Sequence, residues 1–196
     1  MSFTLNIFLF SPFVFTFFGP NTSKIVHPCC HFLCIPNCQK LCSCSQRLHV
    51  DNLLWWLSEY GIHQYPDAKN ILILCDAGGA NSYRHHIFKH RLMEFASQTG
   101  LSVIVSHYPP YYSKWNLIEH RLFSQVHKAL EGFVFTDYQT LERLIEQTST
   151  KTGLRVVVRL NLKDYQKGIK IQIADLSGNR ISHHPEIPEL NYRIYA

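Results

Sequence analysis

Two acidic residues, Asp76 and Glu119, follow segments that can place them at a common crevice. Asp76 comes directly after ILILC at residues 71–75, a short apolar run that predicts a strand buried on both faces. In open α/β sheets ligands gather at the carboxyl ends of strands, so a carboxylate here points into the crevice. Gly78 and Gly79 let the following loop turn tightly and leave room for a phosphate backbone. By position alone, Asp76 fits a helix N-cap or turn equally well.

Glu119 lies in a segment with helical patterning downstream of a di-proline. Pro109 and Pro110 force an extended chain, and a helix is expected over residues 114–130. Asn116 and Glu119 are three residues apart in the sequence and therefore share one helical face. A carboxylate and an amide on one face near a helix start can approach a metal or a substrate. An isolated Glu on an amphipathic helix, in contrast, usually faces solvent.

The elements that must position these residues alternate between helix and strand. Helices are expected over residues 51–60, 83–98 and 137–147, with Asp51 and Asp137 as N-caps and Gly61 and Gly100 as stops. The apolar run at residues 101–107 predicts a second buried strand, which completes a βαβ pattern and favours a mostly parallel sheet. Alternating patterns at 154–160 and 168–173 predict a C-terminal β hairpin or edge pair.

The first fifty residues differ sharply in composition from the rest. They contain no Asp or Glu, although the chain has 14 acidic residues, and they hold six of its 7 cysteines. The Phe-rich start raises the question of a membrane span, but it lacks a preceding positive charge and a cleavage site. The cysteines have no CxxC pair, so zinc spacing is not met. We expect residues 1–50 to form an atypical, poorly ordered segment and residues 51–196 to form the domain.

The overall composition suits one globular domain with a core. The chain has 196 residues, of which 46% are hydrophobic, and a formal charge of +5. That charge allows a polyanionic partner without demanding one, and a mildly basic soluble protein fits it equally well.

Three stretches in order resemble the DDE transposases of the Rhodopirellula type: LILCDAGGANSYR, HYPPYYSKWNLIEHRLFS and TSTKTGLRVVV. The pattern of Pro, Ser, Asn, Ile and Glu more distantly resembles mariner-like transposases. The resemblance runs from about Asp51 to Tyr195. It implies an α/β fold with a ribonuclease H-like mixed sheet flanked by helices, and the function of an insertion-sequence transposase that cleaves DNA and transfers strands.

The resemblance also implies roles for individual residues. By motif, Asp76 is the second catalytic and metal-binding carboxylate and Glu119 the third. Mg²⁺ or Mn²⁺ is the implied cofactor, because hard cations prefer oxygen ligands and a pair of them supports in-line phosphoryl transfer. DNA, as transposon ends and target, is the implied partner, with Lys114, Asn116 and Arg121 beside it. Full-length members of the family are expected to form homo-oligomers.

His107 and Trp115 would flank the same site. His107 ends the second predicted strand, and Trp115 adjoins the expected start of the helix that carries Glu119. A base-stacking role is open to Trp115, but a core aromatic is the more common one.

The chain departs from the family pattern at its first carboxylate. That acid belongs to the first strand, upstream of residue 51, where this chain has none. We therefore expect a truncated domain without its first strands, located in the cytoplasm, without stable membrane association and catalytically incomplete by itself. One alternative is a non-catalytic DNA-binding regulator that uses basic residues Arg84, Lys89, Arg91, Lys114, Arg121 and Lys128. Another is a membrane-anchored or zinc-binding protein led by residues 1–50.

Overall fold

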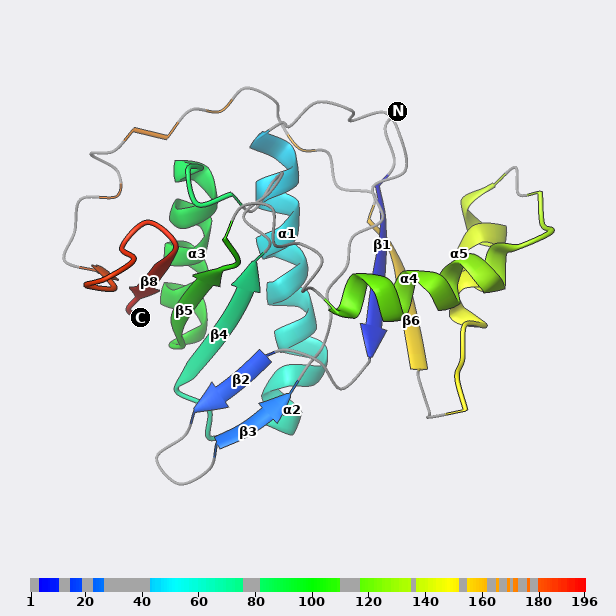
Figure 1. Ribbon diagram of the computed structural model, residues 1–196, viewed down its shortest axis with the longest axis horizontal. Coiled ribbons are helices and arrows are strands. Elements are labelled where there is room, and N and C mark those ends of the chain that lie inside the picture. Colours follow the sequence, from blue (N-terminus) through cyan, green and yellow to red (C-terminus); the bar gives the residue numbers. More distant parts are fainter. Residues whose placement is uncertain are drawn as a thin grey trace. The chain divides into compact units, whose positions relative to one another are not determined.

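The fold is seen in a computed structural model of the chain (Figure 1). It describes residues 4–10, 15–18, 23–26, 43–75, 82–109, 117–134, 137–151, 155–161, 165, 169, 171–172, 176 and 180–196. The chain divides into two compact units. The first comprises Met1–Phe13, His27–Gln39 and Lys114–Asp164, and the second comprises Val14–Val26, Lys40–Ser113 and Tyr165–Ala196.

The second unit is built on a six-stranded mixed sheet with the order β3-β2-β4-β5-β8-β7. Its strands are β2 Phe15–Phe18, β3 Ser23–Val26, β4 Asn70–Cys75, β5 Ser102–His107, β7 Ile181–His183 and β8 Asn191–Ile194. β4 and β5 are parallel, and every other neighbouring pair is antiparallel. This mixed sheet with flanking helices confirms the predicted α/β class.

The parallel pair is joined by helix α3, His86–Thr99, as the βαβ pattern predicts. The side chains of Ile87, Leu92 and Phe95 recur at helical spacing and are buried, so they form the inward face of the helix. Gly100 ends the helix in the left-handed region at φ 71°, and its N–H donates to the Ala96 carbonyl. Lys89 falls in the first turn of this helix.

The two parallel strands bury alternate residues rather than both faces. Val103, Val105 and His107 of β5 are buried and their neighbours in the strand are partly exposed. In β4 the side chain of Cys75 is buried, whereas Leu74 is 36% exposed. The prediction that these strands are buried on both faces is therefore wrong, because helical cover lies over the face that includes the alternate residues. The Cys75 side chain is 3% exposed and packs in the core.

A long helical segment precedes β4 and starts earlier than predicted. It consists of α1 Ser43–Trp56, the π-helical turn η1 Leu57–Gly61 and α2 Ile62–Gln64. The prediction of Asp51 as an N-cap is wrong, because Asp51 lies in the interior of α1. Its carboxylate forms an ion pair with Arg91 of α3 and accepts a hydrogen bond from the Tyr165 hydroxyl at 3.0 Å.

Gly61 does not stop this helix, contrary to prediction. Its backbone is helical, with φ −63°, and the helix continues past it. A Cβ at this position would lie 2.8 Å from Leu57 Cδ1 and 3.0 Å from Trp56 Cζ3, both on buried side chains. The glycine is therefore required by close packing inside the helix rather than by a turn.

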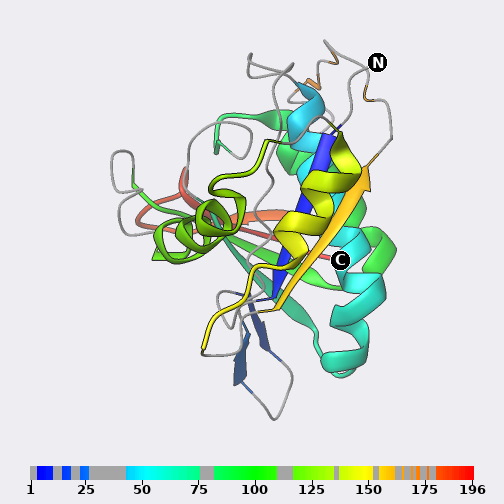
Figure 2. The same ribbon diagram turned by 90° about the vertical axis from the view of Figure 1, so that its right-hand side faces the viewer.

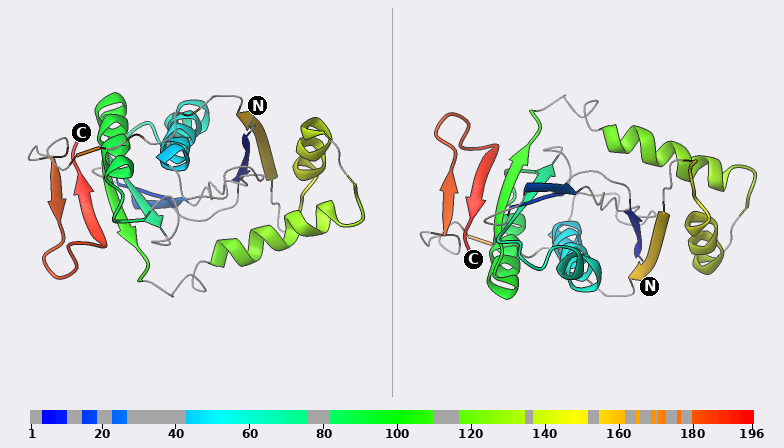
Figure 3. Two further views of the ribbon diagram at one scale, coloured as in Figure 1. Left: turned by 90° about the horizontal axis from the view of Figure 1, so that it is seen from above. Right: turned by 90° about the horizontal axis from the view of Figure 1, so that it is seen from below.

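Helices α1 and α3 lie side by side on one face of the sheet (Figure 3). Leu53 and Trp56 of α1 and Phe95 and Ala96 of α3 are buried, so apolar packing accompanies the ion pair between the helices. Arg91 also pairs with Glu94 one turn along α3. Burial opposes the charge of Arg91, but its hydrogen bond to Asp51 and the nearby carboxylates give a net rise in its pKa.

The C-terminal hairpin is confirmed, but it is formed by other residues than predicted. β7 and β8 pair antiparallel, with Ile181 opposite Ile194, and β8 also pairs with β5. Most of the second predicted strand, at 168–173, lies outside the described residues. β6, Arg155–Asn161, pairs antiparallel with β1, Thr4–Phe10, in the first unit. The β1–β6 and β5–β8 pairings therefore join segments that are distant in the sequence.

The first unit combines the β1–β6 ribbon with helices α4, Leu117–Leu130, and α5, Tyr138–Glu146. α5 lies against the ribbon (Figure 2) and buries Leu141, Leu144 and Ile145. Asp137 caps α5 as predicted, since its carboxylate accepts a hydrogen bond from the Thr140 N–H at 2.6 Å. That bond lowers the pKa of Asp137.

Among the described residues, none of the helices has the length and apolar character needed to cross a membrane. Helix α1 runs across the boundary predicted between residues 50 and 51. The division into a segment at 1–50 and a domain at 51–196 stays a prediction.

Candidate functional site

The carboxyl ends of β4 and β5 lie next to each other at one edge of the sheet. Cys75 and His107, the last residues of the two strands, are register partners. Just beyond them, the Tyr108 N–H donates a hydrogen bond of 2.7 Å to the Cys75 carbonyl. The carboxyl ends of β4 and β5 therefore meet at the kind of edge where parallel sheets gather their ligands.

The predicted site residues fall partly outside the described residues. Asp76, Lys114 and Asn116 lie outside them, as does Trp115. Glu119 and Arg121 belong to α4, of which the structure describes the backbone at these positions. A shared metal site of Asp76 and Glu119 stays a prediction. Within the described ranges, no group of three or more His, Cys, Asp or Glu side chains is arranged to hold a metal ion.

His107 is the described residue at this edge with the most unusual surroundings. Its side chain is only 4% exposed, and both ring nitrogens are buried without a hydrogen-bond partner. Burial, followed by the charge of Lys89, lowers the pKa of His107 to about 4. The imidazole is therefore neutral at physiological pH and acts as a polar group held inside the fold.

Aromatic rings surround His107. The ring of Tyr83 lies 6.1 Å away edge-on, and that of Tyr192 lies 5.9 Å away. Tyr192 of β8 is 2% exposed, and burial raises the pKa of its hydroxyl well above the usual value. The Lys89 ammonium lies 4.9 Å from the centre of the Tyr192 ring, where a cation is attracted to the π face. Burial lowers the pKa of Lys89, and the charge of Glu189 partly opposes that change.

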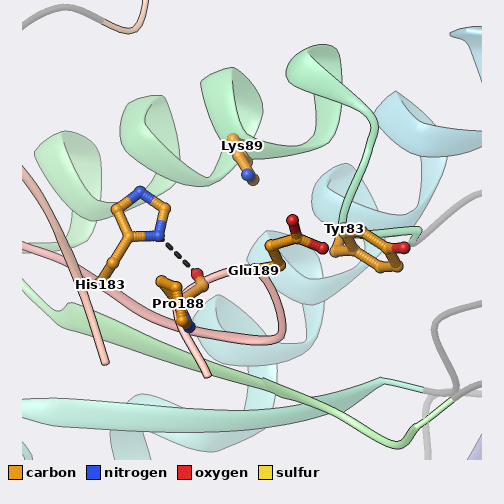
Figure 4. Close-up of a pocket in the computed structure, with 5 residues that line it drawn as sticks. All are labelled: Tyr83, Lys89, His183, Pro188 and Glu189. Carbon is orange, nitrogen blue, oxygen red and sulfur yellow. Dashed lines mark hydrogen bonds between the residues drawn. The ribbon is translucent and has the colours of Figure 1, made fainter. Parts of the chain in front are cut away.

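A pocket of about 280 Å³ opens beside this cluster, between α3 and the turn that joins β7 to β8 (Figure 4). It is lined by Tyr83, Lys89, His183, Pro188 and Glu189. His183 Nδ1 lies 2.6 Å from the Pro188 carbonyl oxygen. Because a carbonyl oxygen only accepts, His183 Nδ1 donates in this contact. The pocket thus combines an aromatic ring, one cation, one carboxylate and an imidazole.

Sequence reasoning missed this pocket. It identified Lys89 only as one of several basic residues, and it assigned no role to Tyr83 or Glu189. A usable signal was the alternation in β5, which places His107 on the same buried face as Val103 and Val105. A histidine on such a face must be enclosed by other side chains. The residues that enclose it come from a different part of the sequence.

The basic residues predicted to contact phosphates differ in availability. Arg91 forms ion pairs with Asp51 and Glu94, so its guanidinium already has acidic partners. Arg84 is exposed, stacks 5.2 Å from the Tyr83 ring centre and donates to the Tyr83 hydroxyl. Lys128 is exposed on α4. Of the basic residues predicted to contact phosphates, Arg84 and Lys128 are thus exposed in the described part of the chain.

Comparison with known proteins places the chain in a family. A search of curated proteins and a search of solved structures each found no match. A family model described as the Rhodopirellula transposase DDE domain matches residues 46–196, which include β4, β5, β7 and β8 as well as Asp76 and Glu119. Since this match covers well over half of the sequence, the chain belongs to the Rhodopirellula transposase DDE domain family.

Proposed function

We propose that this chain binds DNA and contributes two carboxylates, Asp76 and Glu119, to a site for phosphoryl transfer in transposition. The observation that carries the proposal is the family match over residues 46–196, which contains both acids in order. Membership of a transposase family supports a transposase function and implies DNA as partner. The end of β4 beside β5 supports the location of Asp76, because ligands in such sheets bind there.

The proposed ligands, the carboxylates of Asp76 and Glu119, are of the chemical type that binds a hard divalent cation. Carboxylate oxygens are the ligands that Mg²⁺ and Mn²⁺ prefer, and Asp76 and Glu119 would hold the metal. Bound divalent cations supply Lewis-acid stabilisation of the phosphoryl charge. The chain's own residues hold and orient the DNA: Lys114 and Arg121 neutralise phosphates, and the Asn116 amide donates and accepts hydrogen bonds.

In number, the donor set is one carboxylate short of the three that the family uses. Within the second unit, β4 is bordered on one side by β5 and on the other by β2, which runs antiparallel to it. Neither β2 nor β3 contains an acid, nor does any residue before Asp51. We therefore propose that the 196-residue chain by itself does not cut DNA efficiently.

The metal site is tested by calorimetric titration of the chain with Mn²⁺. Asp76→Asn and Glu119→Gln should each weaken Mn²⁺ binding by about tenfold or more, since each removes one oxygen ligand. Matched controls are Glu59→Gln in the second unit and Glu146→Gln in the first, both of which are exposed and lie outside the two sequence motifs. Control variants that weaken Mn²⁺ binding as much as Asp76→Asn would contradict the assignment.

The incomplete site is tested by nicking of supercoiled plasmid with Mn²⁺. The chain should give no nicking above background. Strong nicking that Asp76→Ala abolishes would show that a third ligand exists elsewhere in the chain and that the proposed deficit is wrong.

A second candidate function is DNA binding without cleavage, as in a regulator derived from a transposase. It is favoured by the exposure of Arg84 and Lys128, which can contact phosphates whether or not metal binds. Salt-dependent DNA binding by Asp76→Asn equal to that of the unsubstituted chain would support it.

A further inference from the structure

We propose that the pocket between α3 and the β7–β8 turn receives one unpaired nucleobase of DNA and prefers guanine. The inference rests on the proposed DNA partner, and it concerns residues that the transposase motifs do not include. All five lining residues belong to the second unit (Figure 4). Two of them follow Asp76 in the sequence: Tyr83 lies just before α3, and Lys89 lies in the first turn of α3.

The charges of the pocket argue against a phosphate as its occupant. Lys89 contributes one positive charge to the pocket, and Glu189 contributes one negative charge. A phosphate placed beside Lys89 would also meet the Glu189 carboxylate and be repelled. A neutral ligand that offers both donors and acceptors satisfies both side chains.

The pocket's size and walls argue for a small ring system. Its volume of about 280 Å³ lies just below the range of roughly 300–1,000 Å³ typical of pockets for drug-sized ligands. Tyr83 supplies an aromatic ring and Pro188 an apolar surface, and both suit a flat heterocycle. Proteins that take a base out of its stack read it in this way, by stacking and by hydrogen bonds to its Watson–Crick edge.

The donors and acceptors of the pocket select among the four bases. A carboxylate has two acceptor oxygens, and guanine alone presents two adjacent donors on its Watson–Crick edge, N1–H and the N2 amino group. Lysine donates to guanine O6. The Lys89 ammonium is positioned by the buried Tyr192 ring, whose centre lies 4.9 Å away. It does not form an ion pair with Glu189 within 4.0 Å, so both side chains can bind a base.

The experiment measures binding of fluorescently labelled oligothymidines by anisotropy, with EDTA present so that no metal chemistry occurs. The three probes carry one central guanine, one central hypoxanthine, which lacks the N2 amino group, or no purine. The unsubstituted chain should bind the guanine probe on the order of tenfold more tightly than the all-thymine probe. The hypoxanthine probe should fall between them.

Two glutamates of the same turn give a matched pair of variants. Glu189→Gln should lose the guanine preference, whereas Glu186→Gln removes the same charge from an exposed residue that does not line the pocket and should retain it. Lys89→Met gives a second test on α3 and should also lose the preference. Far-ultraviolet circular dichroism establishes that each variant is folded.

The outcomes separate this inference from the proposed function. Equal binding of all three probes by the unsubstituted chain would overturn the guanine pocket and leave DNA binding intact. Binding of none of the probes would overturn both. A guanine preference that survives Glu189→Gln would also overturn the pocket, because it would show that another part of the chain reads the base.

Discussion

Asp51 of α1 and Arg91 of α3 are 40 residues apart in the sequence, and they form an ion pair that joins the two helices. The Asp51 side chain is 14% exposed and that of Arg91 26% exposed, so water screens the pair only partly. Tyr165 donates a second hydrogen bond to Asp51, and its ring centre lies 5.7 Å from the Arg47 guanidinium carbon. The pair thus anchors a polar network on the sheet face that α1 and α3 cover.

Breaking this pair should destabilise the fold. Asp51→Asn leaves Arg91 half-buried with Glu94 as its remaining acid, so the free energy of unfolding should fall by about 1–3 kcal/mol. Urea denaturation at neutral pH measures the change. The exposed Glu59→Gln serves as control and should alter stability by no more than about 0.5 kcal/mol. An equal effect of both variants would mean that the pair adds nothing to stability.

Stability should depend on pH through His107. Its pKa is about 4 in the folded chain, below the ordinary 6.5, so the unfolded chain binds the extra proton between these values. The neutral His107 therefore does not reduce the free energy of unfolding above pH 6.5. As the pH falls from 6.5 toward 4, the free energy of unfolding should decrease progressively, by up to about 3 kcal/mol. His107→Leu removes this group and should unfold at higher urea than the unsubstituted chain at pH 4.5.

The control for this pH dependence is His63→Gln, since His63 is an exposed histidine on α2. It should follow the unsubstituted chain across the whole pH range. If His107→Leu loses as much stability as the unsubstituted chain between pH 7 and pH 4.5, another group is responsible.

Gly61→Ala tests the packing inside the π-helical turn. Alanine is favoured over glycine in a helix by about 1 kcal/mol, but here its Cβ would approach Leu57 and the rigid Trp56 ring at 2.8 and 3.0 Å. Overpacking costs typically about 1–3 kcal/mol, so we expect a net loss of stability of about 1 kcal/mol. Thermal unfolding measures it. A gain in melting temperature would show that the Leu57 side chain moves aside freely.

The salt dependence of DNA binding should distinguish exposed from committed arginines. Arg84→Ala should lower the slope of log binding constant against log salt by about one, as expected for the loss of one phosphate contact. Arg91→Gln should leave the slope unchanged, because Arg91 is paired with Asp51 and Glu94. Equal slopes for Arg84→Ala and the unsubstituted chain would exclude a phosphate contact by Arg84.

The sequence predicted the elements that local signals define. The βαβ unit, the left-handed Gly100 and the Asp137 cap all depend on residues within a few positions of one another, and all were confirmed. Gly61 and Asp51 have the types that commonly end and begin helices, yet both lie inside one. Their actual roles depend on contacts with Trp56, Arg91 and Tyr165, and no local sequence pattern predicts those contacts.

Pairings over long distances were beyond local reasoning. The hydrogen bond from Ser106 to Asn191 spans 85 residues, and β7 has only 3 residues, too few to give a strand pattern. For the site, motifs identified Asp76 and Glu119. The pocket was missed because the pairing of β8 with β5 is what brings Glu189 close to Lys89, and no local sequence pattern predicts that pairing.

The antiparallel pairing of β8 with β5 has a practical consequence for handling the protein. Ile194 is fully buried opposite Val103, and the His107 N–H donates to the Leu190 carbonyl, so β8 is an interior strand of the sheet. Tyr195 and Ala196 follow β8 and are exposed, so a purification tag attached to Ala196 would begin outside the sheet. A chain that ended before Asn191 would lack β8. One edge of β5 would then be unpaired, and the pocket would be lost as well.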